Sequence, residues 1–167
     1  MSYEVSVVVN NFCEGMRMGR NPDFIVGDPA DPYMHRWWMI PRNAVANIYW
    51  HLFLRDDEDR ALHDHPWPSL SIVMRGGYYE ITRGPDGTLQ RRWYGVGSII
   101  FRWATYTHRV ELARDAQGRV INCETLFLTG PRIREWGFHC PKGWVHWRKF
   151  CAVDSPGQIG GGCGEDA

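Results

Sequence analysis

The sequence lacks net charge, a long apolar run and a paired cysteine motif. Lysine plus arginine and aspartate plus glutamate number 19 each, so no basic footprint for nucleic acid is expected. No apolar segment approaches the roughly 20 residues that a membrane helix requires, and no N-terminal segment resembles a signal peptide. We therefore expect a cytoplasmic protein that binds neither nucleic acid nor membranes.

Cysteine pairs of the C-x-x-C type are absent as well. The chain has 5 cysteines, an odd number: Cys13, Cys123, Cys140, Cys151 and Cys163. This pattern indicates neither a disulfide framework nor a zinc knuckle, and it fits a reducing compartment. Cys123 and Cys140 are expected to behave as small hydrophobic residues, as buried cysteines usually do.

Helical periodicity is scarce, whereas short runs of branched and aromatic residues, separated by Gly, Pro and Asp, dominate the middle of the chain. Such runs predict short β-strands. The expected strands span residues 36–40, 46–54, 69–75, 78–82, 89–94, 98–102, 108–112, 121–129 and 136–140. Many short strands predict an all-β sandwich or barrel rather than a doubly wound sheet.

Two connections between these strands predict tight hairpins. Residues 84–87 read Gly-Pro-Asp-Gly and residues 115–118 read Asp-Ala-Gln-Gly. Proline presets φ for a turn, and glycine accepts the positive φ that closes it. The first turn is expected to join the strands at 78–82 and 89–94, and the second those at 108–112 and 121–129.

The chain is expected to form one domain over residues 1–153, followed by a flexible Gly-rich tail over 154–167. Apolar residues at helical spacing predict a short helix within 144–153. Residues 1–21 are compatible with an edge strand at 4–9 or with a loosely packed arm. Segment 130–144, which is dense in aromatic residues, Gly and Pro, suits a rigid lid over a barrel mouth.

Two histidines separated by one residue, His63 and His65, are the strongest functional signal in the chain. In a β-strand both side chains point to the same face, while Asp64 points away. His108 lies in a second strand-like run and can supply a third ligand from across a barrel. Three neutral imidazoles suit Fe, Ni, Cu or Zn and leave open positions for a substrate or dioxygen.

The spacing around these histidines resembles the first motif of the cupin superfamily, G-x5-H-x-H-x(3,4)-E-x6-G. His63 and His65 match its paired histidines, and Gly76 matches its last glycine. Ser69 stands where the glutamate would fall, and Asp57 stands at the leading glycine. The resemblance therefore rests on spacing and on the histidines.

The second cupin motif, G-x5-P-x-G-x2-H-x3-N, is matched in its outer spacing by Gly97 and His108. Trp103, Thr105 and Leu112 replace its Pro, Gly and Asn. The two motifs together cover roughly residues 57–112. The aromatic stretch and the HDHPW run are also similar to small cupin-like proteins of bacteria and their phages.

The resemblance implies a cupin-type double-stranded β-helix, a jelly-roll barrel, with a divalent metal held by His63, His65 and His108. Because Ser69 is a poor ligand, the site is similar to the three-His site of the cysteine dioxygenase branch. The implied metal is Fe(II), with Ni, Zn or Mn as alternatives. The resemblance also implies a homodimer.

We predict from this a non-haem Fe(II) dioxygenase-type oxidoreductase acting on a small anionic or thiol substrate. The His-x-Asp/Glu pair of the 2-oxoglutarate oxygenases is absent, because His65 and Trp67 occupy the positions two residues after His63 and His65. A non-catalytic cupin that binds a small molecule or a partner is one alternative. A cupin isomerase or epimerase, which needs a general base, is another.

Tyr49 and Arg60 are the candidate catalytic residues. A tyrosine can orient bound oxygen or act as an acid, and an arginine can neutralise a substrate carboxylate. Core filling and surface ion pairing are the ordinary roles of these residue types. The other candidates of the same kinds are Tyr78, Tyr79, Tyr94, Tyr106, Arg75, Arg102, Arg132 and Arg134. The remaining histidines are expected to be structural, although His51 or His139 could support the site from outside the ligand set.

Overall fold

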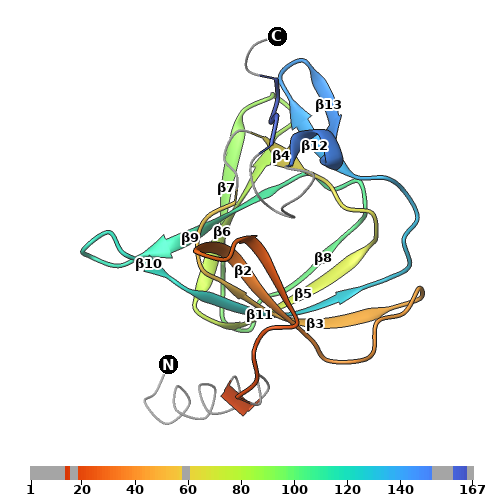
Figure 1. Cartoon of the computed structure of the whole chain (residues 1–167). Coiled ribbons are helices and arrows are strands. Elements are labelled where there is room, and N and C mark those ends of the chain that lie inside the picture. The colour runs from red at the N-terminus through yellow and green to blue at the C-terminus, as the bar shows by residue number, and fades with distance from the viewer. Residues whose placement is uncertain (1–13, 16–18, 58–60, 152–159, 165–167) are drawn as a thin grey trace.

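The computed structural model describes residues 14–15, 19–57, 61–151 and 160–164. These residues form three antiparallel sheets and a short helix, which confirms the predicted all-β class (Figure 1). The largest sheet has the strand order β1-β2-β3-β11-β5-β8. Its strands are β1 (Phe24–Asp28), β2 (Asp31–Trp38), β3 (Asn47–Phe53), β11 (Cys123–Thr129), β5 (Ser69–Arg75) and β8 (Ile99–Arg102).

The second sheet has four strands in the order β10-β9-β6-β7. Its strands are β10 (Val120–Ile121), β9 (Arg109–Arg114), β6 (Gly77–Arg83) and β7 (Leu89–Gly95). The chain passes from β5 to the hairpin β6–β7, returns to β8, crosses to β9 and β10, and returns again to β11. This alternation between two sheets is the arrangement of a double-stranded β-helix, as predicted.

The third sheet caps one end of the barrel and has the order β13-β12-β4. Its strands are β4 (Leu62–His63), β12 (Gly137–Cys140) and β13 (Gly143–His146), and α2 (Trp147–Phe150) follows directly. Phe138 and Phe150 stack at 3.6 Å between ring centroids within the apolar core of this cap. The segment predicted to form a lid therefore contributes a strand pair packed on β4.

Both predicted turns are present, but the second hairpin is shorter than predicted, because only β10 pairs back onto β9 across its turn and the rest of the expected strand is β11 in the large sheet. Gly87 (φ 83°) closes the turn between β6 and β7, and Gly118 (φ 78°) closes the turn between β9 and β10. Gly76 (φ 69°) joins β5 to β6, where an added Cβ would lie 2.3 Å from the backbone oxygen of Asn122. Only glycine fits this crowded corner, which explains the glycine at the end of the first motif.

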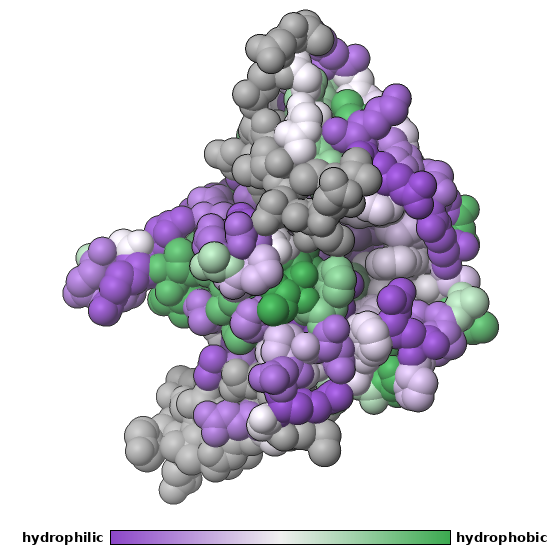
Figure 2. All heavy atoms as spheres, viewed as in Figure 1, coloured by the Kyte–Doolittle hydropathy of each residue, from purple (hydrophilic) through white to green (hydrophobic). Residues whose placement is uncertain are grey.

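The main core lies between the two larger sheets and contains Val73, Tyr78, Ile100, Val110 and Leu112. Alternate positions of β5 are buried, and the buried face carries Ser69, Ser71 and Val73, while Leu70, Ile72 and Met74 on the other face are half-buried. The outer face seen in Figure 2 is mostly polar, with a small group of apolar residues near β1 and β2. None of the described helices is long and apolar enough to cross a membrane.

Several expectations need correction. Cys140 and Cys163 form a disulfide, so the inference that no disulfide is present is wrong, and the cysteine pattern no longer supports a reducing compartment. The disulfide and two backbone hydrogen bonds to the Phe150 oxygen attach residues 160–164 of the predicted tail to the cap. The C-terminal helix is shorter than predicted because β13 occupies the start of its range. The possible edge strand at 4–9 lies outside the described residues.

Candidate metal centre

The two segments that carry the three predicted ligands are joined by an isolated β-bridge between His63 and His108. The backbone amide of His63 donates to the oxygen of His108 at 2.9 Å, and the amide of His108 donates to the oxygen of His63 at 3.0 Å. The amide of His65 donates to the oxygen of Ala104 at 3.1 Å. The backbone ladder therefore holds two histidines from one segment beside one from another.

The three imidazoles, called the histidine cluster from here on, converge on one point. One ring nitrogen from each of His63, His65 and His108 lies within 4.8 Å of the others. The Nε2 atoms of His65 and His108 are 2.8 Å apart, a distance at which one nitrogen donates and the other accepts. Nitrogen lone pairs that converge in this way are what a metal ion requires from histidine ligands.

A buried carboxylate orients His108 from behind. Glu80, on β6, lies 2.7 Å from Nδ1 of His108 through Oε1. Arg102 donates from Nε to the same oxygen at 2.6 Å, and the Tyr106 hydroxyl donates to the other at 3.0 Å. With its Nδ1 proton donated to Glu80, His108 presents the lone pair of Nε2 to the cluster, as in carboxylate–histidine–metal arrangements.

His63 also has a carboxylate beside its Nδ1 atom. Asp57 Oδ2 lies 3.7 Å from that nitrogen and accepts the backbone amide of Val110 at 2.9 Å. Tyr33 makes a side-chain hydrogen bond to Asp57, and burial together with this carboxylate raises the pKa of Tyr33 well above its usual value. The phenol is thus held in its neutral form at the edge of the site.

The electrostatics favour neutral imidazoles at two members of the cluster, His65 and His108. Burial lowers the pKa of His65 well below the usual histidine value, and the neighbouring His63 and His108 lower it further. Burial also lowers the pKa of His108 strongly, with an added effect of the Arg102 guanidinium. Metal ligation requires deprotonated histidine, so these residues are in the form that binds.

Asp64 points away from the histidine cluster, as strand alternation predicts. Its side chain is 1% exposed, accepts the Gly137 amide at 2.8 Å and forms an ion pair with Arg134 at 2.8 Å. Burial raises the pKa of Asp64, but the bonds from Arg134, Gly137 and His139 hold it below the usual value. Asp64 therefore attaches β12 to the strand that carries the ligands.

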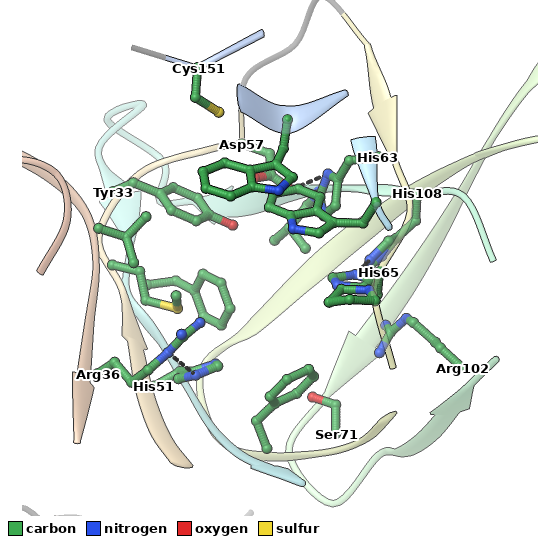
Figure 3. Close-up of a pocket in the computed structure, with 18 of the residues that line it drawn as sticks. Tyr33, Arg36, His51, Asp57, His63, His65, Ser71, Arg102, His108 and Cys151 are labelled. Carbon is green, nitrogen blue, oxygen red and sulfur yellow. Dashed lines mark hydrogen bonds and ion pairs between the residues drawn. The ribbon is translucent and has the colours of Figure 1, made fainter. Parts of the chain in front are cut away.

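The histidine cluster faces a partly open cavity of about 320 Å³ between the barrel and the cap (Figure 3). Phe53 and Phe127 line it from the large sheet, and Trp136, Phe138 and Trp147 line it from the cap. Arg36 and His51 also line it, from β2 and β3. Its volume and aromatic walls are typical of a small-molecule site.

The two candidate catalytic residues are not placed at this cavity by the structure. Tyr49 is buried and stacks on His51, and it is not among the residues that line the cavity. Arg60 lies outside the described residues. The four other candidate arginines each have a carboxylate partner, in the pairs Arg75–Glu124, Arg102–Glu80, Arg132–Glu135 and Arg134–Asp64.

Sequence reasoning missed Glu80, Asp57 and Arg36 as residues of the site. One signal was available for Glu80, because a glutamate two residues after Tyr78 in an apolar strand must face inward with it. Asp57 stands in the acidic run Asp56-Asp57-Glu58-Asp59, a pattern that is typical of a solvated turn. Arg36 was the first residue of an expected strand, and nothing in its neighbourhood indicates what it faces.

Comparisons with known proteins give a likeness of fold. No protein-family model and no curated protein matches the chain. Among solved structures, the DMSP lyase DddQ from Ruegeria pomeroyi DSS-3 is 14% identical (TM-score 0.48) over 66% of this chain and 54% of its own length. A cupin superfamily protein from Desulfitobacterium hafniense DCB-2 is 11% identical (TM-score 0.44) over 59% and 77%. Iron(II) HppE in complex with its substrate is 12% identical (TM-score 0.49) over 66% and 56%.

These matching structures include cupin and double-stranded β-helix proteins. The chain spans about half the length of DddQ and HppE. At these identities the likeness concerns the fold alone.

The residues present fit a divalent metal. Three histidine nitrogens converge, His108 is oriented by a buried carboxylate, and the cluster opens onto a cavity. Among the described residues, no carboxylate belongs to the cluster itself. A ligand set of three neutral nitrogens is therefore the site that this fold provides.

Proposed function

We propose that this protein is a metal-dependent oxidoreductase that holds iron(II) between His63, His65 and His108 and oxidises a small substrate with dioxygen. The observation that carries the proposal is the convergence of three ring nitrogens within 4.8 Å at the wall of a cavity lined largely by aromatic side chains. Imidazole ligands suit iron, and a site with three protein ligands leaves positions for other molecules.

The protein's own groups would prepare this chemistry in three ways. Glu80 fixes the tautomer and the ring orientation of His108. Burial keeps His65 and His108 neutral and ready to bind. The aromatic side chains of the cap limit the access of water to the cavity. When bound, iron(II) would supply Lewis acidity and one-electron chemistry with dioxygen.

The character of the cluster bears on the kind of substrate. Three neutral imidazoles do not offset the charge of a divalent cation, so the ligand set favours an anionic or thiolate group on the substrate. The walls formed by Phe53, Phe127 and Trp147 suit an apolar body. We therefore propose a small anionic or thiol-bearing substrate.

Metal content tests this proposal directly. Iron is measured by mass spectrometry in tag-free protein, in a His63→Ala/His108→Ala variant and in a His139→Ala control. His139 bonds to Asp64 outside the cluster, so its variant is expected to keep the near-stoichiometric iron of the wild type, whereas the double variant loses it. Circular dichroism checks that all three proteins are folded.

Oxygen consumption by the iron-loaded protein then tests the reaction. A panel of small thiols and organic acids is offered to anaerobically loaded protein, and the wild type is expected to consume oxygen with at least one of them. Failure to bind metal even after reconstitution would overturn the proposal. Correct iron occupancy without turnover on any compound would argue against oxygenase chemistry.

A further inference from the structure

Arg36 is a charged residue at the cavity that the oxidoreductase proposal does not use. It lies on β2, and Figure 3 shows it beside His51 on the side of the cavity opposite His65. The cavity therefore has a cationic group on one wall and the histidine cluster on another. Aromatic and apolar residues, including Phe53 and Phe127, complete the lining.

Of the arginines that the structure describes, three line the cavity, and Arg36 differs from the other two in its partners. Arg102 forms an ion pair with Glu80 at 2.6 Å, and Arg55 forms one with Asp31 at 3.5 Å. Within the described part of the chain, no carboxylate lies within ion-pair distance of Arg36. Desolvation lowers the pKa of its guanidinium to about 10, which reflects a charge that has lost part of its contact with water. Arg36 is half-buried, and a partly desolvated cation without an anion is stabilised when a ligand supplies one.

The neighbours of Arg36 fix its guanidinium without neutralising it. Nε donates to Nε2 of His51 at 2.9 Å, and the guanidinium carbon lies 4.9 Å from the centroid of the Tyr49 ring. His51 is buried between Tyr49 and Phe127, with ring centroids 5.8 and 5.0 Å away. Burial and the charge of Arg36 hold the pKa of His51 well below its usual value, so His51 is a neutral acceptor.

This hydrogen bond leaves the two terminal amino groups of Arg36 for another partner. A guanidinium that is held at Nε presents the rest of its fork in a fixed plane, which matches the two oxygens of a carboxylate. His51 is stacked and buried, so its side chain is already fixed. It therefore loses little conformational entropy when a ligand binds to Arg36.

We propose that Arg36, held by His51, is a carboxylate-binding site of the cavity, distinct from the histidine cluster. The ligand is a small organic acid whose apolar body packs against Phe53 and Phe127. One part of this inference rests on the proposed function: the substrate of the oxidoreductase carries this carboxylate in addition to the group that reaches the histidine cluster.

The test uses metal-free protein, so that it does not depend on iron. Straight-chain carboxylates from propionate to octanoate, and their primary amides, are titrated by calorimetry. At least one carboxylate is expected to bind, more tightly than its amide. Arg36→Gln is expected to weaken carboxylate binding by about 10-fold to 100-fold, the range for charge-assisted hydrogen bonds, and Arg36→Lys by less.

Arg55→Gln is the matched control, since it removes the same charge from a residue that lines the same cavity but has Asp31 as a partner. Its carboxylate affinity is expected to equal that of the wild type. His51→Phe keeps the ring between Tyr49 and Phe127 but accepts no hydrogen bond. It should weaken binding of carboxylates and leave the amides unchanged, whereas His51→Gln, which has an acceptor oxygen, should restore the wild-type affinity.

The His63→Ala/His108→Ala variant separates this inference from the proposed function. It is expected to lose iron and still bind carboxylates, because Arg36 is intact. Carboxylate binding that disappears in this variant but persists in Arg36→Gln would place the anion at the histidines and overturn the inference. So would the absence of binding by every carboxylate to folded wild-type protein. Neither result bears on whether the wild type retains iron.

Discussion

The histidine cluster and Arg36 line the same cavity but are supported in different ways. Behind His108 lies Glu80, which is 1% exposed and also holds Arg102. Behind Arg36 lies His51, which is neutral and supplies a hydrogen bond but no charge. The charges of Glu80 and Arg102 behind the histidine cluster therefore balance each other, while the positive charge of Arg36 is not compensated by His51.

This difference indicates which kind of ligand each side of the cavity binds. Neutral histidines oriented by a carboxylate match a cation, because the negative charge of Glu80 strengthens the imidazole as a ligand. A rigid guanidinium without an anion matches a carboxylate. Each of the following experiments changes the support on one wall and asks whether the effect stays there.

The largest effect is expected from Glu80→Ala. The change leaves the buried Arg102 without its carboxylate and His108 without its hydrogen-bond partner. Stability should fall by about 3–5 kcal/mol, and metal affinity should fall by about 10-fold to 100-fold. Urea unfolding and competitive metal titration measure the two losses. If the alanine variant does not fold, the same two measurements are made on Glu80→Gln, which is nearly isosteric.

Glu124 provides the matched control for Glu80. It is also fully buried and pairs with an arginine, Arg75, at 2.8 Å, but it lies outside the histidine cluster. Glu124→Gln should lower stability and leave metal affinity unchanged. Equal losses of metal affinity in the Glu80 and Glu124 variants would mean that Glu80 acts through general stability and does not orient His108.

A smaller effect on stability, with little effect on metal affinity, is expected from Asp64→Ala. Asp64 lies between two members of the cluster in sequence, but its carboxylate faces Arg134 and Gly137 of the cap segment. Losing these bonds should cost about 3 kcal/mol, since buried donors lose their acceptor. His65→Ala should show the converse pattern, with iron lost and stability little changed. A loss of metal from Asp64→Ala as large as that from His65→Ala would contradict this division of roles.

Much of the fold is predictable because its signals are local. The strand expected at 69–75 is β5 with the same bounds, since a short apolar run ends there at a glycine with positive φ. The orientation of His63 and His65 relative to Asp64 follows from the alternation of side chains along an extended backbone. The proximity of His63 and His108 was also predictable, because the two motifs have a characteristic spacing.

The partners of the cluster and of Arg36 depend on which strands are neighbours, and no local pattern specifies that. Glu80 reaches His108 because β6 pairs with β9, which places Glu80 opposite Val110. Arg36 meets His51 because β2 pairs with β3 in the register that sets these two residues opposite each other. The Cys140–Cys163 disulfide likewise joins residues 23 positions apart that come together only when the cap is folded.

The smallest expected effect is on the pH dependence of stability. It distinguishes the Arg36 side of the cavity from the histidine cluster once more. The pKa values of His51, on the Arg36 wall, and of His65, in the cluster, are both lowered well below the usual value of 6.5 in the folded protein. The unfolded chain therefore binds more protons below that pH, and stability that is present above pH 6.5 is lost as the pH falls toward the folded pKa. Each such histidine contributes at most about 1.4 kcal/mol per pH unit in this window.

Replacing one of these histidines should therefore flatten the pH dependence of stability. Between about pH 6.5 and about pH 5.5, urea unfolding of His51→Asn and of His65→Asn should each show a loss that is smaller than the wild-type loss by roughly 1 kcal/mol, since the unfolded histidine is already half protonated at about pH 6.5. Added divalent metal should steepen the dependence in His51→Asn, because the cluster is intact, and should have little effect in His65→Asn. A wild-type slope in His51→Asn would mean that this histidine is protonated beside Arg36, and Arg36 would then lack the neutral acceptor on which its geometry depends.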